Sequence, residues 1–138
     1  MNIRFAVVAL ALSALGATTV LSTAVAEESL DGKATVDAKL DASAKQLSLV
    51  VKGVGEGVYV NTEYPLKCSL KIKDGGTLEK AELKKENAKY DEVSGKTGKA
   101  KSATFSVGAD KSVEGSCKVV VCTDNSCSSP FKVAFSSN

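Results

Sequence analysis

Apolar and polar residues alternate strictly in the segment 65–73, which reads PLKCSLKIK. Leu66, Cys68, Leu70 and Ile72 fall on one side of an extended chain, and lysine and serine fall on the other. Successive side chains of a β-strand point to opposite faces of the sheet. The segment therefore predicts a strand whose buried face includes a cysteine and whose solvated face is marked by lysines.

Six further short segments have the same β-rich or alternating character. They are 35–40, 46–54, 57–61, 102–107, 116–122 and 130–135. Gly, Asp, Asn and Ser separate them, and no segment has a clear helical period. The chain is therefore predicted to be all-β, an immunoglobulin-like antiparallel β-sandwich of about seven strands. The segment 77–101 is rich in Lys, Glu and Ala. We expect a surface crossing there with one strand near 81–83, or alternatively a short helix.

The amino terminus has the three parts of a secretory signal peptide. A basic start at Arg4 precedes an apolar run over 5–15, and a small-residue stretch ends in AVA at 24–26. The apolar run is shorter than the roughly 20 residues that cross a bilayer. We expect a signal peptide at 1–26, cleavage after Ala26, and one β-sandwich domain at 27–138 in the bacterial periplasm or outside the cell. No later segment is expected to span a membrane.

The composition of the remaining 112 residues excludes several classes of function. They contain no His, Arg, Trp or Met. Without Arg4 they have 17 lysines and 16 acidic residues, which leaves a net charge of +1. Without histidine there is no imidazole base for a Ser-His or Cys-His site and no imidazole ligand for a metal. The near-neutral charge argues against nucleic acid, which binds to a concentrated basic face. We expect no cofactor, no metal and no nucleic-acid partner.

All four cysteines lie in the predicted mature part, which indicates two disulfides in an exported chain. Four cysteines allow three connectivities, and the alternation helps to choose among them. Cys68 and Cys117 share the inward parity, so they are candidates for a buried bridge. Cys122 falls on the outward parity unless a bulge intervenes, and it opposes Cys127 across the four-residue turn 123–126.

The two predicted bridges differ in what they contribute to stability. The chain-entropy estimate is about 4 kcal/mol for the 50-residue loop from Cys68 to Cys117 and about 2 kcal/mol for the six-residue loop from Cys122 to Cys127. An exposed bridge that closes a short loop is where an exchanging disulfide would be expected. A hairpin clip and a redox-active pair therefore both remain open for Cys122 and Cys127.

The carboxyl-terminal cysteine pair also bears a family resemblance. The exported β-sandwich pattern, the strand entered by Tyr64 and Pro65, and the C-x4-C hairpin followed by Pro130 resemble the amino-terminal domain of bacterial thiol:disulfide interchange proteins of the DsbD type. That resemblance implies an immunoglobulin-like fold with a redox-active pair at Cys122 and Cys127. The spacing is one residue shorter than expected for that family. Serines stand where the family places flanking aromatic residues, and Cys68 and Cys117 are additional.

The leading functional hypothesis is a non-catalytic binding or structural module of the bacterial envelope, with a protein partner there. The alternative is a thiol–disulfide exchange module in which Cys122 and Cys127 are the catalytic residues. A third hypothesis is an inhibitor-like or adhesin-like domain that binds through the loop after Val54, with Tyr59 or Tyr64 in contact with the ligand.

Overall fold

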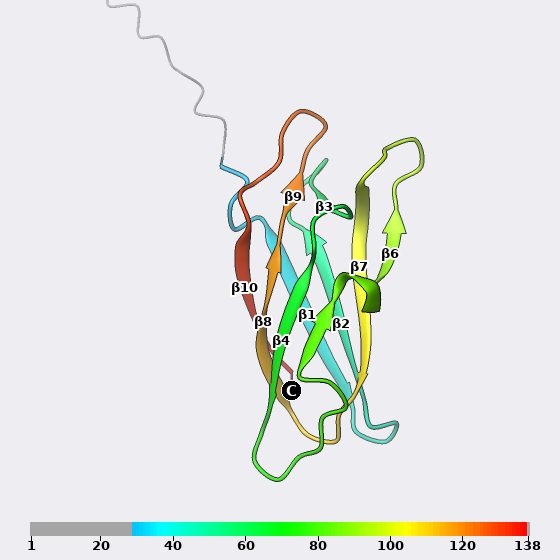
Figure 1. Cartoon of the computed structure of the whole chain (residues 1–138), viewed down its shortest axis with the longest axis vertical. Coiled ribbons are helices and arrows are strands. Elements are labelled where there is room, and N and C mark those ends of the chain that lie inside the picture. Colours follow the sequence, from blue (N-terminus) through cyan, green and yellow to red (C-terminus); the bar gives the residue numbers. More distant parts are fainter. Residues whose placement is uncertain (1–28, 138) are drawn as a thin grey trace, which may run out of the picture.

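The protein folds into two antiparallel β-sheets, as the computed structural model of residues 29–137 shows (Figure 1). The predicted signal peptide lies outside the described residues. The strands are β1 (Ala34–Asp41), β2 (Gln46–Gly53), β3 (Tyr59–Asn61), β4 (Lys67–Ile72), β5 (Glu82–Lys84), β6 (Lys89–Glu92), β7 (Lys99–Gly108), β8 (Val113–Val119), β9 (Val121–Cys122) and β10 (Phe131–Ser136). A single 3-10 turn, η1 (Lys85–Asn87), is the only helical element between residues 29 and 137. The all-β prediction is confirmed.

The order of strands is that of an immunoglobulin-like sandwich. In the first sheet β2 lies between β1 and β7, and β6 pairs with the other edge of β7. This is the order A-B-E-D of that fold. In the second sheet the order is β10-β8-β4-β5, which corresponds to G-F-C-C′. The short strands β3 and β9 extend the first sheet at one end, where β3 pairs with both β7 and β9.

The core lies between the two sheets and follows from the alternation along the longest strands. Leu47, Leu49 and Val51 of β2 are fully buried. On the neighbouring strand β7, the buried residues Val107 and Phe105 are paired with Leu47 and Leu49 and lie on the same face of the sheet. The second sheet contributes buried apolar side chains from every strand; they are Cys68, Leu70, Leu83, Val113, Cys117, Val119 and Phe135. One contiguous apolar cluster therefore joins both layers.

The segment 77–101 connects the two sheets. The expected strand near 81–83 is present as β5, which pairs with β4. The chain then passes through η1 and enters the first sheet as β6, which the sequence did not predict. Only Tyr90 of β6 is partly buried, so the strand has no apolar alternation that would reveal it.

The segment from β8 to β9 belongs to both sheets. β8 pairs with β4 and β10, whereas β9 pairs with β3 in the opposite layer. The change occurs at Val120, whose carbonyl accepts a hydrogen bond of 2.9 Å from the N–H of Asn61. Because the chain leaves the alternation there, the exception allowed for Cys122 applies, and its side chain is buried rather than on the outward side that unbroken alternation predicts. Its exposed fraction is 2 %.

The two disulfides occupy different layers. Cys68 and Cys117 are directly opposed on β4 and β8, so their bond lies within one sheet rather than between the sheets. Cys122 is bonded to Cys127. Two disulfides are typical of an oxidising compartment such as the periplasm or the exterior of the cell. Between residues 29 and 137, no helix has the length and apolar character needed to cross a bilayer.

Candidate functional site

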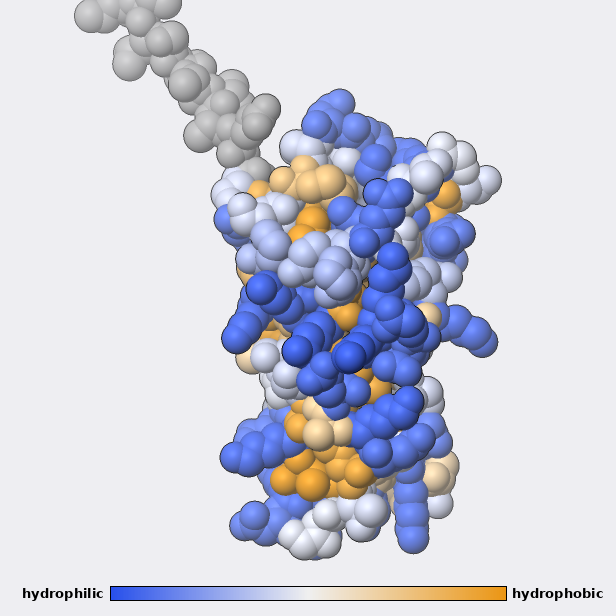
Figure 2. Space-filling model, viewed as in Figure 1, coloured by the Kyte–Doolittle hydropathy of each residue, from blue (hydrophilic) through white to orange (hydrophobic). Residues whose placement is uncertain are grey.

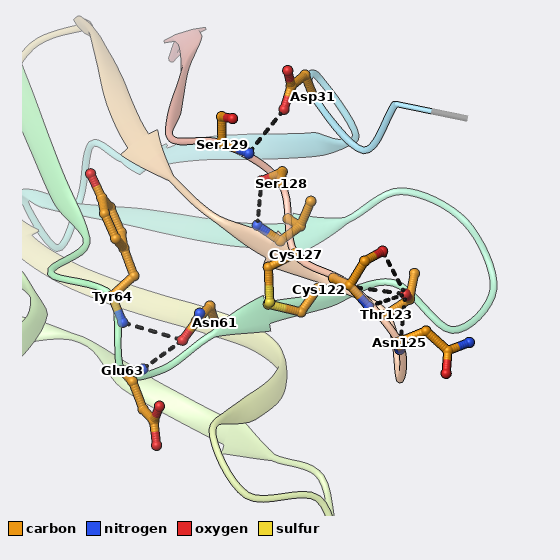
Figure 3. Close-up of a disulfide and its surroundings, with 12 residues drawn as sticks. Asp31, Asn61, Glu63, Tyr64, Cys122, Thr123, Asn125, Cys127, Ser128 and Ser129 are labelled. Atoms are coloured by element: carbon orange, nitrogen blue, oxygen red, sulfur yellow. Dashed lines mark hydrogen bonds between the residues drawn. A yellow bond between two sulfur atoms is a disulfide. The ribbon is translucent and has the colours of Figure 1, made fainter. Parts of the chain in front are cut away.

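The disulfide Cys122–Cys127 lies on a tight hairpin, which we call the clasp together with its turn 123–126 (Figure 3). The Thr123 N–H donates to the Ser126 carbonyl at 2.8 Å, and the Ser128 N–H donates to the Val121 carbonyl at 2.8 Å. These bonds flank the cysteines, which therefore form a non-hydrogen-bonded cross-strand pair, the closer of the two kinds. Their Cα atoms are 4.0 Å apart. The backbone thus brings the two sulfur atoms within bonding reach.

The turn of the clasp is held by its own polar side chains. The Thr123 hydroxyl accepts hydrogen bonds from the Asn125 N–H at 3.4 Å and from the Ser126 N–H at 3.3 Å (Figure 3). Thr and Ser hydroxyls commonly satisfy backbone groups in tight turns in this way. The sequence T-D-N-S therefore forms a fixed loop, which the disulfide closes at its base.

The two halves of the clasp differ in their access to solvent. Cys122, which belongs to β9 of the first sheet, is buried, whereas Cys127 is exposed. Cys127 also lines a small pocket together with the segment 29–31 and the serines that follow it. A reagent that approaches the disulfide would therefore reach Cys127 first.

The amino-terminal segment is attached to the clasp. The carboxylate of Asp31 accepts a hydrogen bond of 3.1 Å from the Ser129 N–H, and the Ser128 hydroxyl accepts one of 3.1 Å from the Val121 N–H (Figure 3). Sequence reasoning missed this contact, because nothing in the pattern around Asp31 indicates which of the later loops it meets. It holds the return loop 128–130 against the start of the domain.

A lysine side chain from the loop between β6 and β7, that of Lys96, contacts the other side of the clasp. The Lys96 Nζ lies 2.6 Å from an Asp124 carboxylate oxygen and 5.0 Å from the centre of the Tyr59 ring. The hydrogen bond from Lys96 lowers the pKa of Asp124, and the same bond raises the pKa of Lys96. Asp124 is thereby neutralised by a lysine that the sequence did not single out.

The two tyrosines named from the sequence have different surroundings. Tyr59 is half-buried in β3, directly opposite Cys122, and its ring contacts Lys96. Tyr64 is half-buried in the turn before β4, where its N–H donates to the Asn61 side-chain oxygen at 3.2 Å. The Tyr64 ring points away from the disulfide in Figure 3. Only Tyr59 is therefore part of the clasp's surroundings.

A shallow pocket lies beside the clasp at the same end of the sandwich. It is lined by three segments, the amino-terminal one, the loop after β2 and the tip of the clasp; the lining residues are Leu30, Lys33, Val54, Gly55, Glu56, Val58, Thr123, Asn125 and Ser126. Val54 is 45 % exposed, and it is the single large hydrophobic residue between 29 and 137 that is exposed rather than buried or half-buried. Gly55 and Gly57 have positive φ angles of 108° and 72°, a conformation that glycine adopts without steric cost.

Comparisons with family models, with curated proteins and with solved structures find no match to this chain.

Proposed function

We propose that this protein is a non-catalytic binding module of the bacterial envelope that holds its partner at the clasp end. The observation that supports this most is the convergence of three segments on one pocket that leaves Val54 exposed. A concave site on which several loops converge, with apolar and polar side chains together, is a common place for a partner to bind. The composition agrees with a non-catalytic role, because the chain has no histidine and no arginine outside the predicted signal peptide.

The loops at this end are fixed before any partner binds. The disulfide closes the turn, Asp31 ties the return loop, and Lys96 ties the tip through Asp124. Ordering a loop during binding costs free energy, so loops that are already ordered bind with a smaller loss. Three separate restraints on one hairpin therefore suit a surface that must present a constant shape.

Site-specific photo-crosslinking in the native host tests this proposal. A photoreactive residue replaces Val54 in one variant and Ser43 in a control, because Ser43 is an exposed turn residue between β1 and β2. We expect a discrete protein adduct from position 54 and none from position 43. Equal adducts from both positions, or none from either, would refute a binding role for the clasp end.

A second candidate function, thiol–disulfide exchange, is favoured by the unequal exposure of the clasp cysteines. A partner thiolate would attack the sulfur of Cys127, the Cys122–Cys127 bond would break, and Cys122 would leave as a thiolate that takes up a proton. A second thiol of the partner would then displace Cys127. The partner would be oxidised to a disulfide and the clasp reduced to two thiols. The resemblance to DsbD-type proteins supports this role, while the serines at 126, 128 and 129 depart from it.

Measurement of the clasp's reduction potential separates the two candidates. Exchange requires a potential well above about −300 mV, the limit typical of structural bridges. Equilibration in thiol–disulfide buffers, followed by alkylation and mass mapping of Cys122 and Cys127, gives the value. A potential below that limit would exclude exchange and leave the binding proposal intact.

A further inference from the structure

Four lysines form one row across the outer face of the second sheet. In the strand register Lys132 of β10 is opposite Lys118 of β8, Lys118 is opposite Lys67 of β4, and Lys67 is opposite Lys84 of β5. All four side chains are exposed. We call them the lysine row. It crosses the sheet from one edge strand to the other, with one positive charge on every strand.

The free protein only partly compensates this charge. Like charges that face each other across neighbouring strands are destabilising. Glu82 lies 3.5 Å from Lys67 and 3.9 Å from Lys84, so one carboxylate serves two lysines. Among residues 29–137, no carboxylate forms an ion pair with Lys118 or Lys132. Within the described part of the chain, half of the lysine row thus has no paired counter-charge.

The rest of the face shows that the charge is arranged as a line. The next row along the strands contains Glu82, Ser69, Ser116 and Ala134, and the row after it pairs Lys71 with Glu114. Neither row adds a net positive charge. Neighbouring strands are about 4.8 Å apart, so the lysine row offers charges at a regular spacing over roughly 14 Å. A linear ligand with repeated negative charges complements such a row.

We propose that the lysine row binds a linear acidic polysaccharide, laid across the second sheet with its carboxylates against the lysines. A chain of uronic acid residues carries one carboxylate on every sugar, so its negative charges recur along a line, as the positive charges of the lysine row do. An anionic bilayer fits less well, because stable adsorption adds buried apolar or aromatic side chains to the charge. On this face Ala134 is the outward apolar residue of β10. In Figure 2 hydrophilic residues dominate the middle of the view, and a group of hydrophobic residues lies below them. This inference stands apart from the clasp end and does not depend on its function.

Equilibrium binding to fluorescently labelled polygalacturonate at about 50 mM NaCl tests the proposal, since low salt leaves surface charges less screened. The test variant is K118Q/K132Q. The control is K39Q/K101Q, which removes the same charge from exposed positions of β1 and β7 in the other sheet. We expect saturable binding by the wild type, about tenfold weaker binding by K118Q/K132Q, and a change within about twofold for the control. Neutral dextran should not bind.

The remaining outcomes also decide the matter. Absence of binding, or equal weakening by both double variants, would overturn the proposal. Tighter binding to phosphatidylglycerol vesicles or to single-stranded DNA than to polygalacturonate would assign the row to a different polyanion and would also overturn it. Thermal melting serves as the folding control, because K118Q/K132Q removes like-charge repulsion and should melt no lower than the wild type.

Discussion

The two disulfides should stabilise the fold to different extents, and their separate removal measures the difference. The variants are C68A/C117A and C122A/C127A. The bonded residues are 49 positions apart in the first bridge and 5 in the second, so the closed loops contain 50 and six residues. Cross-linking lowers the entropy of the unfolded chain by an amount that grows with the logarithm of the loop length. The estimates are about 4 kcal/mol for Cys68–Cys117 and about 2 kcal/mol for Cys122–Cys127.

The position of each bridge adds to this difference in the same direction. Cys68 and Cys117 are fully buried in the apolar cluster, so their replacement by alanine also removes packed sulfur atoms from the core. Cys127 is exposed, and the hydrogen bonds around Thr123 remain when the clasp disulfide is removed. We therefore expect C68A/C117A to lose at least about 2 kcal/mol more than C122A/C127A.

Urea unfolding followed by far-ultraviolet circular dichroism provides the measurement. The free energies extrapolated to water must be compared rather than the midpoints, because an unfolded chain without a cross-link is more expanded and its m-value rises. Reduced wild-type protein is the control and should lose about the sum of the two chain-entropy terms alone, because its thiols still fill the space that alanine leaves empty. Equal losses for the two variants, or a larger loss for C122A/C127A, would refute the reasoning.

Three further predictions follow from contacts around the clasp and between the strands. Titration of the native protein with dithiothreitol should reduce the clasp before Cys68–Cys117, because Cys127 is exposed; mass mapping that finds both pairs reduced together would contradict this. Because Lys96 lowers the pKa of Asp124, the carboxylate stabilises the fold above its unfolded pKa and stops doing so as the pH falls through its lower folded pKa. The wild type should therefore melt above D124N at pH 7, with a difference that disappears once the pH has fallen through the lowered folded pKa of Asp124; a constant difference would argue against the ion pair. A β-carbon on Gly115 would overlap the Ser69 carbonyl oxygen of β4, so G115A should cost about 3 kcal/mol in urea unfolding, and an unchanged midpoint would show that β4 and β8 are less closely apposed.

Strands with one buried face were predictable because burial imposes a period of two on the sequence. The alternation in β4 places Cys68 on the inward face, and the lysines between the apolar residues are exposed. β6 has no such pattern, since it is an edge strand with one partly buried residue, Tyr90. Its pairing with β7 is a backbone interaction, which leaves little trace in side-chain type.

The surroundings of the clasp were less predictable than the clasp itself. A cysteine pair around a four-residue turn is visible in the sequence, because turn chemistry is local. The burial of Cys122 depends on the change of sheet at Val120, and four consecutive residues from 119 to 122 are buried there. The ties to Asp31 and Lys96 join segments that are 98 and 28 positions apart in the chain, so only the fold brings them together.

The segment from β8 to β9 has a consequence for how the protein acquires its bonds during oxidation. Cys117 and Cys122 are on one extended stretch, and five residues of extended chain span roughly 16 Å, far beyond the 7 Å limit for Cα atoms joined by a disulfide. Once this stretch is extended, those two thiols cannot join each other, and one of the two wrong pairings is removed. An oxidising enzyme then has a single scrambled isomer left to correct.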